Sequence, residues 1–236
     1  MIQTVLESEP DNQALINEYL KYIDEKEFPC VAAKAARGRE NIKCMVATHM
    51  ACPNDDKIIL DFLYGFVDEY RQSGELYHSA AIIFKSNGKM NEAQFDDILW
   101  QRLQALSDLD AKFFGYDKRV SADPLSPAFS FSIKGEAFYI IALHPSSSRE
   151  ARRFKYATLV FNPHNQFEKL RETSKYNNLK GVVRKRDIAY SGSVNPMLND
   201  FGEASEVYQY SGRKYDSSWE CPLKTKHARV EHHIAT

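Results

Sequence analysis

The chain has 236 residues, of which 43% are hydrophobic and 27% charged, a composition typical of globular proteins. Its formal net charge of -1 excludes a global electrostatic attraction to nucleic acid or to membranes. The sequence contains no run of about 18 apolar residues that could span a membrane. Because Glu7, Glu9 and Asp11 interrupt any apolar N-terminal segment, we expect no signal peptide. The cysteines show no zinc-binding spacing, and they are expected to be reduced thiols in the cytoplasm.

Helical and strand-like patterns alternate along the first half of the chain. The spacing of Leu15, Tyr19 and Ile23 predicts a helix over residues 11–26. The small residues at 30–37 fit either a short buried helix or a tight turn. Further apolar patterns predict a strand at 43–47, a loop at 48–56, a helix at 57–73, a strand at 76–85 and a helix at 91–107.

The second half begins with an irregular stretch, 108–127, and then changes to strands. Apolar and polar residues alternate at 129–133, and a second, apolar strand-like run follows at 137–143. Together the two runs predict a β-hairpin. The remaining patterns predict a short basic helical turn at 150–154, a strand at 158–161, a short helix at 166–174 and a strand at 182–189. We therefore expect one α+β domain over residues 1–236, with a largely antiparallel sheet covered by helices.

The segment Phe138–Phe167 carries the strongest functional signal. Two strand-like runs each end next to a proline, and each has a histidine at that point. His144 precedes its proline and His164 follows its proline. Between the two histidines lie Arg149, Arg152 and Arg153. Guanidinium groups grip carboxylates and phosphates, and imidazole can ligate a metal or transfer protons. The segment therefore predicts an anion site beside a histidine, although His164 could simply cap the following helix.

Cys30, in FPCVAAKAAR, is a candidate iron ligand, because its small neighbours would let a flat ring approach closely. The alternative is a buried small hydrophobe, the usual role of a free cysteine. Cys221, in WECPL, has the same two interpretations. The basic run 184–186 is interpreted as solvated surface.

Asp200, Glu203 and Glu206 follow one another at helical spacing, so their carboxylates could share one face of a helix. Paired carboxylates suit a cationic guanidinium or amine. An ordinary acidic helix start is the alternative, since the helix dipole favours it. The sequence contains no glycine-rich phosphate loop, nucleophile elbow or H-E-x-x-H motif.

Several long motifs resemble the YqcI/YcgG family, which includes haem-dependent N-hydroxylases of guanidino compounds of the guanitoxin-pathway type. The matching segments, within residues 28–223, are FPCVAAKAA, LHPSSSREARRF, LVFNPHNQFEKLR, RDIAYSGSVNPMLNDFGEASEVYQYSGR and WECPL. The resemblance implies O2-dependent hydroxylation of a guanidine or amine nitrogen in an arginine-like small molecule. It further implies haem b, an external electron donor and a cytoplasmic location.

The resemblance also implies roles for particular residues. His144 would ligate the haem iron, with Cys30 or His164 as competing choices. Asp200, Glu203 or Glu206 would hold the substrate cation. The residues implied to bind the cofactor, its propionates above all, are Arg149, Arg152, Arg153 and Lys34. Two alternatives stay open, namely a haem-binding sensor or carrier without oxygenase activity and a haem-free anion-binding protein. The sequence leaves the choice between monomer and homodimer open.

Overall fold

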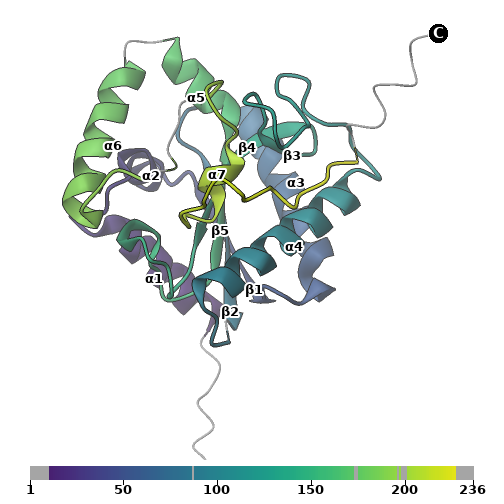
Figure 1. Ribbon diagram of the computed structural model, residues 1–236, viewed down its shortest axis with the longest axis horizontal. Coiled ribbons are helices and arrows are strands. Elements are labelled where there is room, and N and C mark those ends of the chain that lie inside the picture. Colours follow the sequence, from purple (N-terminus) through teal and green to yellow (C-terminus); the bar gives the residue numbers. More distant parts are fainter. Residues whose placement is uncertain (1–10, 87, 173–174, 196, 198–200, 227–236) are drawn as a thin grey trace, which may run out of the picture.

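The computed structural model describes residues 11–226 except 87, 173–174, 196 and 198–200, and within them a five-stranded sheet has the order β1-β2-β5-β4-β3 (Figure 1). The strands are β1 (Ile42–His49), β2 (Ser79–Ser86), β3 (Phe131–Ile133), β4 (Glu136–Leu143) and β5 (Thr158–Pro163). β1 and β2 pair in parallel, whereas the other neighbouring strands pair antiparallel. The predicted α+β class with a mostly antiparallel sheet is confirmed.

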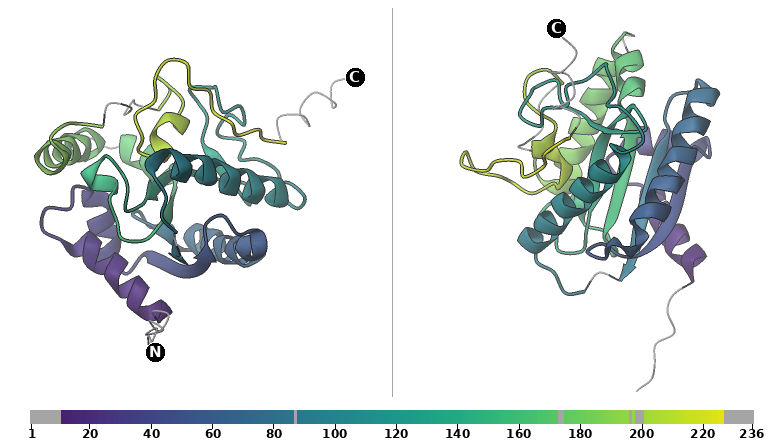
Figure 2. Two further views of the ribbon diagram at one scale, coloured as in Figure 1. Left: turned by 60° about the horizontal axis from the view of Figure 1, so that its bottom comes forward. Right: turned by 90° about the vertical axis from the view of Figure 1, so that its right-hand side faces the viewer.

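The two faces of the sheet support separate cores, because successive residues of a strand point to opposite sides. Ile82, Phe138 and Ile140 pack in the core formed with α3 (Asp56–Ser73) and α4 (Glu92–Asp110). Ala81, Ile83, Leu143 and Val160 pack on the other face against α1 (Asn12–Asp24). Figure 2 shows α1 on one side of the sheet and α3 and α4 on the other.

The helices α2 (Val31–Gly38), α5 (His164–Arg171) and α6 (Lys175–Ser191) gather around the face that α1 covers. The short α7 (Val207–Tyr210) instead packs Val207 and Tyr210 into the core under α4. Two 3-10 turns complete the described elements, η1 (Pro53–Asp55) before α3 and η2 (Glu150–Arg152) after β4. Residues 30–37 therefore contribute a helix rather than a tight turn. No helix within the described ranges is long and apolar enough to cross a membrane.

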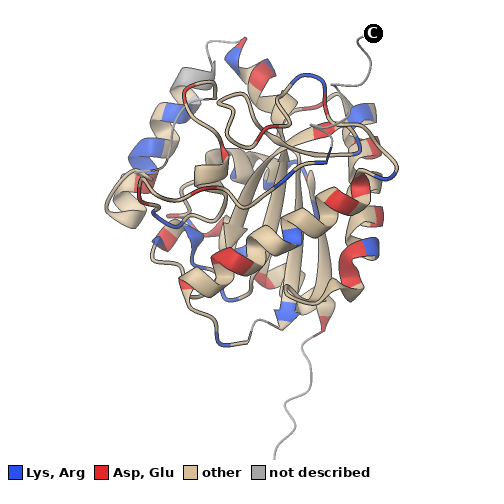
Figure 3. Ribbon diagram, turned by 45° about the vertical axis from the view of Figure 1, so that its right-hand side comes forward, with Lys and Arg blue, Asp and Glu red and all other residues tan. Residues whose placement is uncertain are grey.

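The predicted strand at 182–189 is wrong, because these residues lie in α6. Val182 and Ile188, whose β-branched side chains suggested a strand, are each 49% exposed. Polar contacts hold this helix instead. Arg186 donates to the backbone carbonyls of Lys26 and Phe28. Basic residues are grouped on α6, while α3 and α4 carry charges of both signs (Figure 3).

A buried guanidinium holds the segment between β1 and α3. Arg102 of α4 is 4% exposed, and its Nε donates to the carbonyl of Met50 at 2.9 Å. Another guanidinium nitrogen donates to the carbonyl of Cys52, and the group forms an ion pair with Asp56 at the start of α3. One side chain therefore joins α4 to the chain reversal that leads into α3.

Replacing Arg102 by alanine is expected to lower the free energy of unfolding by about 3–5 kcal/mol, because a buried carboxylate and several carbonyls would lose their partner. Urea denaturation measures the change. The control is Lys57→Ala, which breaks an exposed ion pair with Asp61 and should cost at most about 1 kcal/mol. Similar losses in the two variants would contradict the structural role of Arg102.

Candidate functional site

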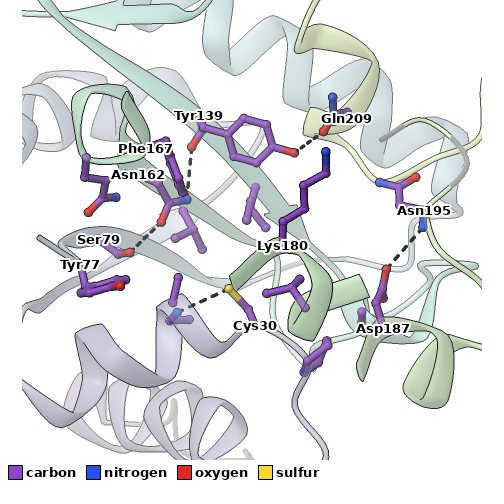
Figure 4. Close-up of a pocket in the computed structure, with 18 of the residues that line it drawn as sticks. Cys30, Tyr77, Ser79, Tyr139, Asn162, Phe167, Lys180, Asp187, Asn195 and Gln209 are labelled. Atoms are coloured by element: carbon purple, nitrogen blue, oxygen red, sulfur yellow. Dashed lines mark hydrogen bonds between the residues drawn. The ribbon is translucent and has the colours of Figure 1, made fainter. Parts of the chain in front are cut away.

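A pocket of about 300 Å³ lies on the sheet face that carries α1, beyond the part that α1 packs against. Its floor includes Tyr139 and Ile141 of β4 and Val160 and Asn162 of β5, and its walls come from α2, α5 and α6 (Figure 4). Pockets of roughly 300–1,000 Å³ hold small molecules and cofactors. The size and the partly apolar lining therefore fit a small ligand or part of a larger one.

The polar groups of the floor form a chain of hydrogen bonds (Figure 4). Ser79 Oγ donates to Asn162 Oδ1 at 2.7 Å, and Asn162 Nδ2 donates to the backbone carbonyl of Tyr139 at 3.2 Å. The Tyr139 hydroxyl donates to Gln209 Oε1 at 2.7 Å. These contacts hold the floor in a fixed arrangement, as a binding site requires. Sequence reasoning missed all four residues, although Asn162 belongs to the Asn-Pro-His motif.

Cys30 caps the N-terminus of α2 and lies in the pocket (Figure 4). Its Sγ accepts a hydrogen bond from the backbone N–H of Ala33 at 3.4 Å. Burial raises the pKa of the Cys30 thiol, so a thiolate here needs a bound cation or metal to stabilise it. Ala32 and Ala33 line the wall beside the sulfur. Lys34 donates instead to the backbone carbonyl of Glu25, and it does not line the pocket.

Arg149 and Arg153 have different surroundings although both belong to the predicted arginine group. Arg149 lines the pocket, pairs with Asp187 of α6 and donates to the carbonyl of Ser193 at 2.9 Å. Arg153 pairs with Glu150 at 2.7 Å on a half-exposed surface and does not line the pocket. Only Arg149 of these two can therefore contribute to the site.

Arg152 lines the pocket as a deeply buried guanidinium. Its terminal nitrogens donate to the carbonyls of Ala142, Gln209 and Tyr210 at 3.2, 3.0 and 3.3 Å. Burial lowers the pKa of this side chain. Arg152 therefore brings a positive charge to the pocket while joining β4 to α7.

Three further cationic residues line the pocket, Arg171, Lys180 and Arg184. Lys180 points into it from α6 (Figure 4). The interpretation of residues 184–186 as solvated surface is wrong for Arg184, which lines the pocket, and for Arg186, which donates to two carbonyls. The carboxylates that line the pocket are Asp187 and Glu206. The excess of cations favours a ligand with negative charge.

Glu206 is buried beside the pocket, immediately before α7. Its Oε2 accepts hydrogen bonds from Ser130 Oγ at 2.9 Å and from the Tyr210 hydroxyl at 3.3 Å. The predicted acidic helix face is wrong, because Glu203 lies in an exposed turn whereas Glu206 faces the pocket. Asp200 lies outside the described residues.

His164 lines the same pocket as Cys30, whereas His144 does not. Since Leu143 faces the α1 core, the next residue points to the opposite side of the sheet. There the His144 ring stacks on Phe95 of α4 with ring centroids 4.0 Å apart. His144 lines a second pocket of about 480 Å³ at the N-terminus of α4. The structure therefore separates His144 from the arginines and the thiol that the sequence placed with it.

A family model described as the YqcI/YcgG family matches residues 19–224, a range that includes every residue lining the first pocket. The chain belongs to the YqcI/YcgG family. It is 25% identical over 190 residues to the uncharacterized protein YqcI of Bacillus subtilis (strain 168), and the match covers 78% of this chain and 74% of that protein. No solved structure matches this family member. The family resemblance indicated by the sequence motifs is thus confirmed.

The free energy of unfolding is expected to depend on His144 below neutral pH. Burial lowers the pKa of His144 to about 4, whereas the unfolded chain has a histidine pKa of about 6.5. The unfolded state therefore binds this proton more readily, and stability falls by up to about 3 kcal/mol as the pH drops from about 6.5 to about 4.

Urea denaturation at several pH values tests this expectation. His144→Gln carries no group that titrates in this range, so the variant should lose less stability than the native protein between about pH 6.5 and pH 4. The same loss in both proteins would show that His144 is not held neutral by burial.

Proposed function

We propose that this protein is a haem-dependent N-hydroxylase that uses O2 to hydroxylate a guanidine or amine nitrogen of an arginine-like small molecule. One observation carries the proposal. A thiol, a buried carboxylate and five cationic side chains line the same partly apolar pocket. Membership of the YqcI/YcgG family supports the same activity through the resemblance of the motifs to its N-hydroxylases.

The residues of the pocket fit haem b. Cys30 supplies a donor atom at the N-terminus of α2. Although burial raises the pKa of its thiol, coordination to iron would stabilise the thiolate. Arg149, Lys180 and Arg184 offer positive charge for two propionates. We assign the iron ligand to Cys30 rather than His144, because His144 lines the other pocket. When bound, haem supplies the oxygen chemistry, and a thiolate ligand favours O–O cleavage.

Glu206 is the residue best placed to hold the cationic end of the substrate. Its carboxylate is buried, and hydrogen bonds to one oxygen orient it. A charge-assisted bond between this carboxylate and a guanidinium would be strong in such surroundings. Ile141 and Val160 of the floor and Phe167 of α5 provide apolar surface against which the rest of the substrate would pack. The substrate nitrogen would thereby be held in one orientation.

The proposed reaction also needs an electron donor, which we assign to an external redox partner. The four cysteines, all within the described residues, are free thiols. Free thiols suit the reducing conditions of the cytoplasm, where we place the protein.

Titration of the purified protein with hemin is expected to produce a Soret absorption band. Cys30→Ser should shift the band or weaken hemin binding, because it removes the proposed donor. Cys221→Ser is the matched control, since Cys221 does not line the pocket. The shift of the band with carbon monoxide separates thiolate from imidazole ligation. A protein that gives no Soret band would favour a haem-free anion-binding protein, and loss of the band only in His144→Gln would move the ligand to His144.

Glu206→Gln is expected to lower kcat/KM for a guanidino substrate by about 10- to 100-fold, because a buried charged hydrogen bond is lost. Product is measured by mass spectrometry as the gain of one oxygen atom. The Soret band should persist, and Glu203→Gln, in the exposed turn, should behave like the native protein. Haem binding without any product would instead favour a sensor or carrier.

A further inference from the structure

His164 lies between two carboxylates that come from different parts of the chain. Its Nε2 is 3.0 Å from Glu168 Oε1 on the same helix, and its Nδ1 is 3.4 Å from Glu206 Oε1. The Glu168 side chain is 40% exposed, whereas those of His164 and Glu206 are 5% and 7% exposed. The three side chains therefore lie in a row between solvent and the pocket, with a hydrogen bond between His164 and Glu168 and a 3.4 Å approach without a hydrogen bond between His164 and Glu206.

The surroundings hold the imidazole in this line. The ring of Phe201 lies against it with centroids 4.4 Å apart. Arg171 pairs with Glu168 at the outer end. At the inner end, Ser130 and Tyr210 donate to Oε2 of Glu206, so Oε1 is the oxygen that faces Nδ1.

We propose that Glu168, His164 and Glu206 conduct protons between solvent and the pocket. The inference rests on the proposed function, because inserting one atom of O2 into an N–H bond and reducing the other to water consumes two protons as well as two electrons. The external donor supplies the electrons. Protons must reach a pocket whose walls are partly apolar, and this line of titratable groups provides a route.

Each transfer changes only bonds to hydrogen. Glu168 takes up a proton from solvent and passes it to Nε2. When Nδ1 and Oε1 of Glu206 approach to hydrogen-bond distance, the proton on Nδ1 passes to Oε1. Glu206 then releases its proton into the pocket and is again the carboxylate that holds the substrate. No electrons move along the line, and the imidazole then returns to its first tautomer. Imidazole suits this position because it can accept a proton at one nitrogen while it releases one at the other.

Glu168→Gln is the decisive variant, since the amide oxygen still accepts a hydrogen bond from Nε2 but the side chain cannot release a proton. Hydroxylation should fall by about 100-fold, with a larger solvent deuterium isotope effect. Glu168→Asp restores a carboxylate and should recover most of the activity. The matched control is Glu172→Gln, an exposed residue at the end of α5. Hemin binding should be the same in all of these variants.

A second measurement does not need haem or turnover. The exchange of the His164 ring proton with water, measured by NMR, should be slower in Glu168→Gln than in the native protein and in Glu172→Gln. If the protein binds no haem, the proposed function fails while this exchange measurement still decides whether the relay exists. Equal exchange rates in the native protein and Glu168→Gln would overturn the proton relay.

Discussion

The buried guanidinium of Arg152 is the contact on which the arrangement of the pocket depends. It binds the carbonyl of Ala142 in β4 and the carbonyls of Gln209 and Tyr210 in α7. Removing it would leave these buried acceptors without a partner, which is costly. The backbone also comes close to this side chain at Gly212, where an added Cβ would lie 2.8 Å from Arg152 Cγ. The late segment that carries Glu206 is therefore positioned by a charge rather than by apolar packing alone.

The structure gives two residues of the arginine-rich motif, Arg149 and Arg152, a role in the fold in addition to the anion binding that the sequence predicted. Arg149 and Arg152 line the pocket, yet both already bind groups of the protein. Arg149 joins η2 to α6, and Arg152 joins η2 to α7. Both arginines add to the positive electrostatic potential that a ligand in the pocket would meet. Lys180 and Arg184, which α6 brings to the pocket, are the cations added from outside that motif. Cationic residues from η2 and from α6 thus line the same pocket on two sides.

The parts of the fold that the sequence predicted well are those with a regular apolar period. The spacing of Leu15, Tyr19 and Ile23 predicted α1, and the alternation around residue 131 predicted the hairpin of β3 and β4. Residues 182–189 were predicted as a strand but form part of α6. A short run with β-branched residues does not distinguish a strand from a helix, and polar contacts of Arg186 stabilise the helix.

The site was harder to predict, because it depends on which side of the sheet each residue faces. Sequence proximity placed His144 with Arg149, but the alternation along β4 turns His144 toward α4. Proximity in sequence likewise grouped Arg153 with Arg152, although only Arg152 points inward. Ser79, Asn162 and Gln209 come from segments far apart in the chain, and no local pattern reveals that hydrogen bonds link them through Tyr139.

The separation of the two sheet faces has a consequence for how members of this fold can diverge. Tyr139 and Ile141 face the pocket, while Phe138 and Ile140, which alternate with them along β4, belong to the core under α3 and α4. Substitutions at the first pair can reshape ligand preference while the opposite core keeps its packing, so new specificities can arise without a large loss of stability. A single-residue insertion in β4 would have the reverse effect, since it would exchange the two sets and damage both faces at once.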